Sequence, residues 1–106
     1  MKNITQEEWR ELLENDDNAV IIDSRTPNEW RAGVFKNSVL MNINDPQSFM
    51  NKANTLDVEK NYYVYCRSGV RSIQSCQVLE SLGIKTTYNL LGGILSWNGE
   101  MIIPEM

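Results

Sequence analysis

The sequence predicts an α/β fold, a three-layer α/β/α sandwich in which helices cover both faces of a parallel β-sheet. Residues 19–22 and 62–65 are apolar runs without alternation, a pattern typical of strands buried on both faces. Segments with helix-capping residues and helical spacing lie between the strand candidates. Strands that alternate with helices are joined by right-handed parallel crossovers, which favours a layered sandwich over a bundle or a barrel.

The first half of the chain alternates between capped helices and short strands. Thr5-Gln6-Glu7-Glu8 is a capping box, and Thr26-Pro27-Asn28-Glu29 is a second one with proline at the first helical position. Gly33 is a helix stop. The predicted elements are a helix from Thr5 to about Asn15, a strand over 19–22, a helix from Thr26 to Gly33, a strand over 38–41 and a helix from Asp45 to Ala53.

The second half repeats this alternation around one long helix. Ile73, Cys76 and Leu79 recur at helical spacing and form one apolar face, and Gly83 ends the pattern. The predicted elements are a strand over 61–65, a helix from Val70 to Gly83, a strand over 85–90 and a short helix over 92–97. No repeat, linker or low-complexity tract interrupts the chain, so one domain over residues 1–106 is expected.

Composition and charge narrow the function. The 106 residues are 42% hydrophobic, which supplies the core of one domain, and the net charge is −4. Without a basic cluster on this acidic background, nucleic acid and anionic membranes are not expected partners. The first ten residues carry four charged side chains, so they do not resemble a signal peptide, and the expected location is the cytoplasm.

The two cysteines and the absence of histidine exclude the common metal sites. Zinc, iron–sulfur and haem sites need ligands that the chain lacks, so no metal and no cofactor is expected. Cys66 and Cys76 are separated by a helical segment that places their Cα atoms about 15 Å apart. A disulfide bridges at most about 7 Å. Cys76 lies on the apolar helix face and is expected in the core.

Cys66 is the strongest candidate for a nucleophile. It ends a strand and precedes a helix, so its sulfur faces the free amide groups of the helix N-terminus, which favour the thiolate. Gly69 lets the loop turn its amides inward, and Arg67 and Arg71 bring positive charge near a bound anion. Arg71 opposes the helix dipole, which indicates anion binding or bracing of the loop.

A second group of polar residues follows the strand at 19–22. In parallel sheets, ligands bind beyond the carboxyl ends of the strands, where the chain order reverses. Cys66 is at one such end and Asp23 with Arg25 is at another, so these two strands are expected to be neighbours. Asp23 and Arg25 are interpreted as structural residues that hold the neighbouring loop by hydrogen bonds. Three tryptophans are expected in the core or at its rim: Trp9, Trp30 and Trp97.

Three segments together resemble the single-domain rhodanese family of sulfurtransferases. Residues 21–30, Ile-Ile-Asp-Ser-Arg-Thr-Pro-Asn-Glu-Trp, resemble the family's Asp-x-Arg-x-x-x-Glu element. Residues 66–72 resemble its active-site loop, and residues 91–97, Leu-Gly-Gly-Ile-Leu-Ser-Trp, its closing signature. The resemblance implies a five-stranded parallel sheet and a persulfide intermediate on Cys66. It also implies that the loop amides hold the charged sulfur, with the substrate bound by Arg67, Ser68, Gly69, Val70, Arg71 and Ser72.

The resemblance implies transfer of a sulfane sulfur. The Cys66 thiolate takes sulfur from an anionic donor such as thiosulfate or polysulfide, and the persulfide passes it to cyanide or a thiol. The acceptor thiol belongs to a small molecule or to a protein such as a thioredoxin-like one. One segment departs from the family pattern: Gly33-Val34-Phe35-Lys36-Asn37-Ser38 replaces Gly-His-Ile and a Pro-Gly-Ala turn.

Two other functions fit the same strand, loop and helix. A persulfide carrier or docking module would pass sulfur to one protein partner, and turnover of free thiosulfate or polysulfide separates it from an enzyme. A cysteine phosphatase or arsenate reductase would have five residues between cysteine and arginine, whereas here Arg71 follows Cys66 after four. The shorter loop favours a single sulfur atom over a phosphate with its oxygens.

Overall fold

A five-stranded parallel sheet with helices on both faces forms the structure, a computed structural model that describes residues 1–106. This confirms the predicted fold class and the strand number that the resemblance implied. The elements in chain order are β1 (Lys2–Ile4), α1 (Gln6–Glu14), β2 (Ala19–Asp23), α2 (Pro27–Arg31), β3 (Val39–Leu40), α3 (Pro46–Ala53), β4 (Asn61–Tyr65), α4 (Arg71–Ser81), β5 (Thr86–Leu90) and the 3₁₀ helix η1 (Gly93–Ser96).

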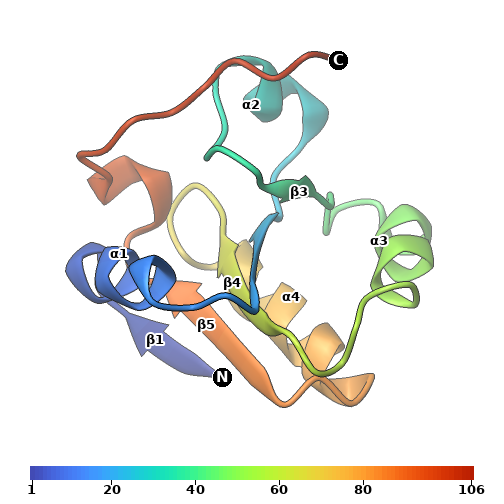
Figure 1. Ribbon diagram of the computed structural model, residues 1–106. Coiled ribbons are helices and arrows are strands. Elements are labelled where there is room, and N and C mark those ends of the chain that lie inside the picture. Colours follow the sequence, from blue (N-terminus) through green and yellow to red (C-terminus); the bar gives the residue numbers. More distant parts are fainter.

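The strand order β1-β5-β4-β2-β3 places β4, the strand that leads to Cys66, at the middle of the sheet. From β2 the chain moves outward to β3, whereas from β4 it moves the other way to β5 (Figure 1). The order therefore reverses between β2 and β4, and Asp23 pairs with Tyr65 in the register of these two strands. The prediction that the strands ending at Asp23 and Cys66 are neighbours is confirmed.

Alternate residues of β4 belong to two separate cores. Tyr62 and Val64 pack on one face with residues of α3 and α4, among them Phe49 and Leu79. The next residues along the strand point to the opposite face, where Trp9 of α1 packs. Figure 1 shows α1 and α4 on opposite sides of the sheet. Because both faces are covered, β4 carries an unbroken apolar run instead of an alternating one.

Strand β1 was not predicted from the sequence. Only Ile4 of this three-residue strand is buried, so the segment lacks the apolar run that marked the other strands. It is an edge strand that pairs with β5 alone, and Asn3 lies opposite Asn89. Other differences are smaller: β3 is limited to Val39–Leu40, and the last helix is a single 3₁₀ element over Gly93–Ser96.

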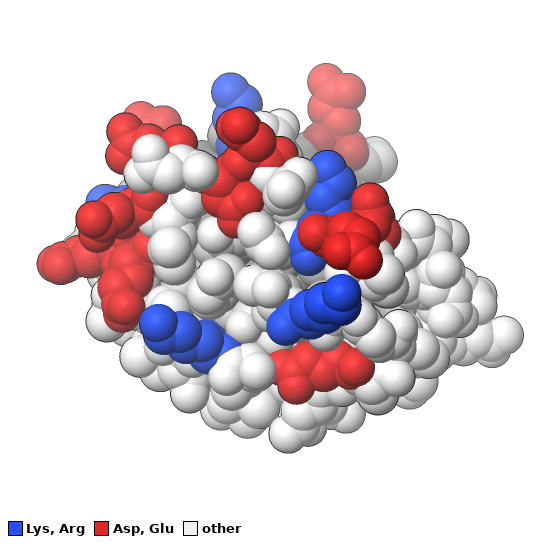
Figure 2. Space-filling view, turned by 60° about the horizontal axis from the view of Figure 1, so that its bottom comes forward, with Lys and Arg blue, Asp and Glu red and all other residues white.

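Several side-chain predictions are confirmed. Cys76 is buried, both cysteines are free, and Trp9 and Trp30 are buried. On the face that Figure 2 shows, acidic and basic side chains are interspersed and no basic patch forms. None of the helices has the length and apolar character needed to cross a membrane.

Trp9 is expected to carry much of the stability of the α1 face. It is buried and makes edge-to-face contacts with Tyr63 and Phe35, at centroid distances of 5.5 and 6.0 Å. Trp9→Ala should reduce the free energy of unfolding by about 3–5 kcal/mol in urea titrations, because it leaves a large cavity. Leu12→Ala, on the exposed side of the same helix, is the control and should cost less than about 1 kcal/mol. Equal losses for both variants would contradict this assignment.

Candidate active site

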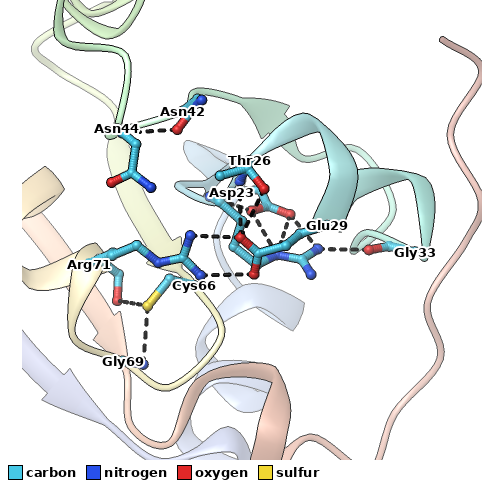
Figure 3. A network of polar contacts seen from close by, with 11 residues as sticks. Asp23, Thr26, Glu29, Gly33, Asn42, Asn44, Cys66, Gly69 and Arg71 are labelled. Atoms are coloured by element: carbon cyan, nitrogen blue, oxygen red, sulfur yellow. Dashed lines mark hydrogen bonds and ion pairs between the residues drawn. The ribbon is translucent and has the colours of Figure 1, made fainter.

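Cys66 lies buried at the end of β4, where the chain turns into α4. Its sulfur accepts a hydrogen bond from the amide of Gly69 at 3.1 Å and lies 3.3 Å from the hydroxyl oxygen of Ser72 (Figure 3). The loop therefore closes over the sulfur with these two contacts, and the nearby amides of Ser68 and Ser72 add to them.

Backbone contacts between the loop and η1 set the direction of the loop amides. The carbonyl of Cys66 accepts from the amide of Ile94, and the carbonyl of Arg67 accepts from the amide of Leu95, both at 3.1 Å. In a trans peptide the N–H group points away from the carbonyl of the same unit. With its carbonyl turned to η1, the Arg67–Ser68 peptide directs the Ser68 amide toward the Cys66 side. The anchor in η1 is thus part of the site.

Two glycines permit this close approach. A Cβ atom on Gly93 would lie 2.4 Å from the carbonyl oxygen of Arg67, which is far inside contact distance. Gly69 has φ +99°, a conformation that side chains disfavour, and a Cβ there would lie 3.2 Å from the carbonyl oxygen of Leu90. Gly93 is therefore required by packing between two backbones, and Gly69 by its positive φ.

The site favours the thiolate of Cys66. Burial alone would raise the pKa of this thiol, but hydrogen bonds with the Ser72 hydroxyl and with the amides of Ser72, Gly69 and Ser68 outweigh it and lower the pKa. Cys76 shows the opposite result, because burial raises its pKa to about 12. Only Cys66 therefore has the environment of a nucleophile.

The matching family model covers residues 5–100 and is described as a rhodanese-like domain. The chain belongs to the rhodanese family. It is 35% identical over 94% of its length to "Putative sulfurtransferase YtwF" of Bacillus subtilis, of which it covers 93%. The solved rhodanese-like domain protein of Staphylococcus aureus is 30% identical, with a TM-score of 0.84, covering 99% of this chain and 100% of that one.

One further relative is much longer than this chain. The tRNA uridine(34) hydroxylase of Pelagibacter ubique is 32% identical over 95% of the chain, but the chain spans only 37% of that protein. The relatives thus bear names of two different activities, and what they share with this chain is the rhodanese-like domain.

Arg71 of this rhodanese-like domain braces the loop through α2. Its guanidinium donates to both carboxylate oxygens of Glu29, at 2.7 and 2.8 Å (Figure 3). Glu29 also accepts from the backbone and hydroxyl of Thr26, so one carboxylate caps α2 and fixes the start of α4. The bonds from Arg71 and Thr26 lower the pKa of Glu29 to about 2, against partial burial. The positive charge of Arg71 is therefore already paired, which is the bracing alternative of the sequence analysis.

The other predicted loop residues are at the surface. Arg67 and Ser68 are exposed, and the side chain of Val70 is 70% exposed. Of the predicted substrate-binding residues, Gly69 and Ser72 contact the sulfur through their own groups.

Asp23 and Arg25 form a buried ion pair beside the loop. The guanidinium of Arg25 donates to Asp23 at 2.8 Å and to the carbonyl of Gly33 at 2.7 Å (Figure 3). Ser24, between them, donates its amide to the carbonyl of Tyr65, the residue before Cys66. This group ties the turn after β2 and the end of α2 to the end of β4.

The segment 33–38, which departs from the family pattern, packs against β4 and the C-terminal residues. Val34 pairs with Ile102 in an isolated bridge. Phe35 stacks on Tyr65 at 4.0 Å, and its amide donates to the Tyr65 hydroxyl at 3.0 Å. An open hollow of about 270 Å³ lies between α1, Phe35 and Trp97, and none of its lining residues belongs to the loop 66–72.

Asn89 is the residue near the sulfur that sequence reasoning missed. It is buried in β5, accepts a hydrogen bond from the Ser72 hydroxyl and donates to the carbonyl of Gly69 at 3.2 Å. A polar residue near the carboxyl end of a strand next to β4 was the available signal. It was hidden because residues 85–90 were assigned only as a strand.

Glu29 should make stability depend on pH at acid values. Its folded-state pKa of about 2 lies below the ordinary 4.5, so its contribution is complete above pH 4.5 and is lost as pH falls toward 2. In urea titrations, Glu29→Gln should therefore be less stable than the parent at pH 6, and the difference should vanish near pH 2. Glu59→Gln is the control, because the ion pair of Glu59 with Lys85 is exposed on both sides. A difference for Glu29→Gln that persists unchanged at pH 2 would contradict the ion pair's role.

Proposed function

We propose that this protein is a sulfurtransferase that carries a sulfane sulfur on Cys66. The observation that supports this most is the loop around the Cys66 sulfur, in which the Gly69 amide lies 3.1 Å from the sulfur. Its amide and hydroxyl groups lower the pKa of the thiol without a histidine in the chain. The loop therefore favours the anionic form of the nucleophile, and the reaction needs no general base.

The reaction is a double displacement. The Cys66 thiolate attacks the outer sulfur of thiosulfate or the sulfane sulfur of a polysulfide. The S–S bond of the donor breaks, and sulfite or the shortened polysulfide leaves with the bonding electron pair. The negative charge then rests on the outer sulfur of the persulfide, beside the loop amides. Cyanide or an acceptor thiolate attacks this outer sulfur, and Cys66 leaves as the thiolate.

The position of Arg71 disfavours the phosphatase and arsenate reductase alternative. An arginine that holds an oxyanion must present its guanidinium to that anion. In this chain both carboxylate oxygens of Glu29 occupy the Arg71 guanidinium, and only four residues separate Arg71 from Cys66. A small sulfur atom held by amides fits this loop better than a tetrahedral oxyanion does.

A persulfide carrier for a protein acceptor is the second candidate. Val70 and Leu95 are 70% and 61% exposed, and both flank the active-site loop, since Leu95 donates its amide to Arg67. Exposed apolar side chains beside a reactive group favour contact with another protein. We infer the sulfur chemistry of a rhodanese domain, acting in the cytoplasm, and not tRNA hydroxylation, because the chain spans only 37% of the relative that carries that name.

Cys66 is expected to gain one sulfur atom on exposure to thiosulfate or polysulfide. Intact-mass analysis followed by peptide mapping should place the added sulfur on Cys66, and Cys66→Ser should abolish both the mass gain and the formation of thiocyanate from cyanide. The control Cys76→Ala should retain both, because the pKa of Cys76 is raised to about 12 and this thiol stays protonated at neutral pH. Persulfide without turnover would favour the carrier. Sulfur mainly on Cys76 would overturn the proposal.

Loop length is expected to decide between sulfur and phosphate chemistry. The protein should hydrolyse aryl phosphates negligibly compared with its sulfur transfer. One glycine inserted after Val70 should raise its affinity for phosphate or arsenate, measured by calorimetry, because the cradle gains one residue. One glycine inserted after Glu59, in the loop before β4, is the control and should leave oxyanion binding unchanged. If the insertion after Val70 fails to raise binding in a folded protein, loop length is not the discriminator.

A further inference from the structure

The hydroxyl of Ser72 has two partners but only one proton. It lies 3.3 Å from the Cys66 sulfur and also donates a hydrogen bond to the side-chain carbonyl oxygen of Asn89. Cys66, Ser72 and Asn89 are all at most 1% exposed, so their hydrogen-bond partners are the protein groups around them. A hydroxyl that donates to Asn89 offers only its lone pairs to the sulfur.

The other contacts of Asn89 fix the orientation of its amide. Its nitrogen lies 3.2 Å from the carbonyl oxygen of Gly69, which can only accept. The same nitrogen donates to the side-chain oxygen of Asn3, its partner across β1 and β5, at 2.9 Å. The oxygen of the Asn89 amide must therefore face Ser72, and an amide oxygen can only accept. This orientation commits the Ser72 proton to Asn89.

The preferred direction of the hydroxyl then depends on the charge of Cys66. A protonated thiol can donate to Ser72, which donates to Asn89, and every group in this chain has a partner. A thiolate needs the Ser72 proton for itself, and turning the hydroxyl toward sulfur leaves the buried oxygen of Asn89 without a donor. The thiolate gains a charge-assisted bond at the cost of an unpaired acceptor.

We propose that Asn89 is a positioning residue for the nucleophile. The Asn89 side-chain oxygen competes with the Cys66 thiolate for the single proton of Ser72. In this arrangement β5 restrains the ionisation that the loop amides favour. The residue acts through Ser72 and does not itself contact the sulfur. The inference rests on the proposed role of Cys66 as nucleophile, but its test reads ionisation alone and needs no sulfur donor.

The charged groups around the sulfur do not obscure the ionisation of the Cys66 thiol. On α4 and α2, Arg71 is paired with Glu29, whose pKa is about 2, and at the end of β2, Asp23 is paired with a buried arginine. Cys76, also on α4, has a pKa of about 12. Arg67 is exposed, and η1 carries no ionisable side chain. A titration between about pH 5 and 10 therefore reports the Cys66 thiol.

The test is the pH dependence of Cys66 alkylation by iodoacetamide, followed by peptide mass mapping. Asn89→Leu keeps the shape of the side chain and releases the Ser72 proton, so the midpoint should fall by about one pH unit, a tenfold change in the thiolate equilibrium. In Ser72→Ala, the same change at Asn89 should leave the midpoint where Ser72→Ala alone places it. Asn3→Ala removes the other partner of Asn89 and should leave the parent midpoint unchanged.

A purely structural role of Asn89 predicts a different result. Loss of its bond to Gly69 would loosen the loop and raise the midpoint, with or without the Ser72 hydroxyl. A midpoint that rises or stays unchanged in Asn89→Leu, or an equal fall in both backgrounds, would overturn the proposal.

A measurement on the unaltered protein covers the case in which Asn89→Leu does not fold. At low pH the S–H stretching band of Cys66 in the Raman spectrum, assigned with Cys66→Ser, should show a hydrogen-bonded donor, because Ser72 presents only lone pairs. The band should move to the position of a free thiol in Ser72→Ala. A free-thiol band for Cys66 in the parent would overturn the proposed direction of the Ser72 proton.

Discussion

The contact between the loop after β4 and η1 is the constraint on which the site depends. Two carbonyls of the loop, those of Cys66 and Arg67, are consumed by the amides of Ile94 and Leu95. Because a peptide unit is rigid and trans, carbonyls that point to η1 leave the amides of the same peptide units pointing to the opposite side, toward the sulfur. The anion-binding property of the loop is therefore set by a segment almost thirty residues later in the chain. Gly93 allows this contact, since a side chain there would collide with the loop backbone.

The charged and the uncharged polar residues around the sulfur have different roles, because the charged ones are paired with each other. Arginines near an anionic site are usually read as anion ligands, but here both arginines of the inner site are committed to carboxylates: Arg71 to Glu29 and Arg25 to Asp23. These pairs fix the positions of α2, α4 and the turn after β2. Activation of the sulfur is left to uncharged groups, namely the backbone amides and, when its proton turns away from Asn89, the Ser72 hydroxyl. A site of this kind stabilises one compact charge and leaves little positive charge for a larger oxyanion.

Sequence reasoning succeeded where local pattern and tertiary structure agree. The unbroken apolar runs of β2 and β4 predicted a sheet covered on both faces, and the position of Cys66 between a strand and a helix predicted the cysteine over which the loop closes. It failed for β1, because an edge strand with one buried residue has no periodic signal. It also did not assign the carboxylate partner of Arg71, since Glu29 is 42 residues away and its capping role already explained it. Family resemblance supplied the strand count that periodicity alone did not.

The role of Asn89 near the sulfur could not be predicted from the sequence, because it depends on the order of the strands in the sheet. Its side chain acts at the sulfur only because β5 is the neighbour of β4 on the side away from β2, an arrangement decided by sheet order. The same order places Asn3 of β1 beside it, where Asn3 accepts a hydrogen bond from the Asn89 amide. The ionisation of Cys66 thus depends on two neighbouring strands: β4 carries the thiol, and β5 holds the competing acceptor. When the polar groups of a buried site are all paired, a change of charge requires one of them to exchange its hydrogen-bond partner. In this fold the group that exchanges is the Ser72 hydroxyl, between the Asn89 oxygen and the Cys66 sulfur.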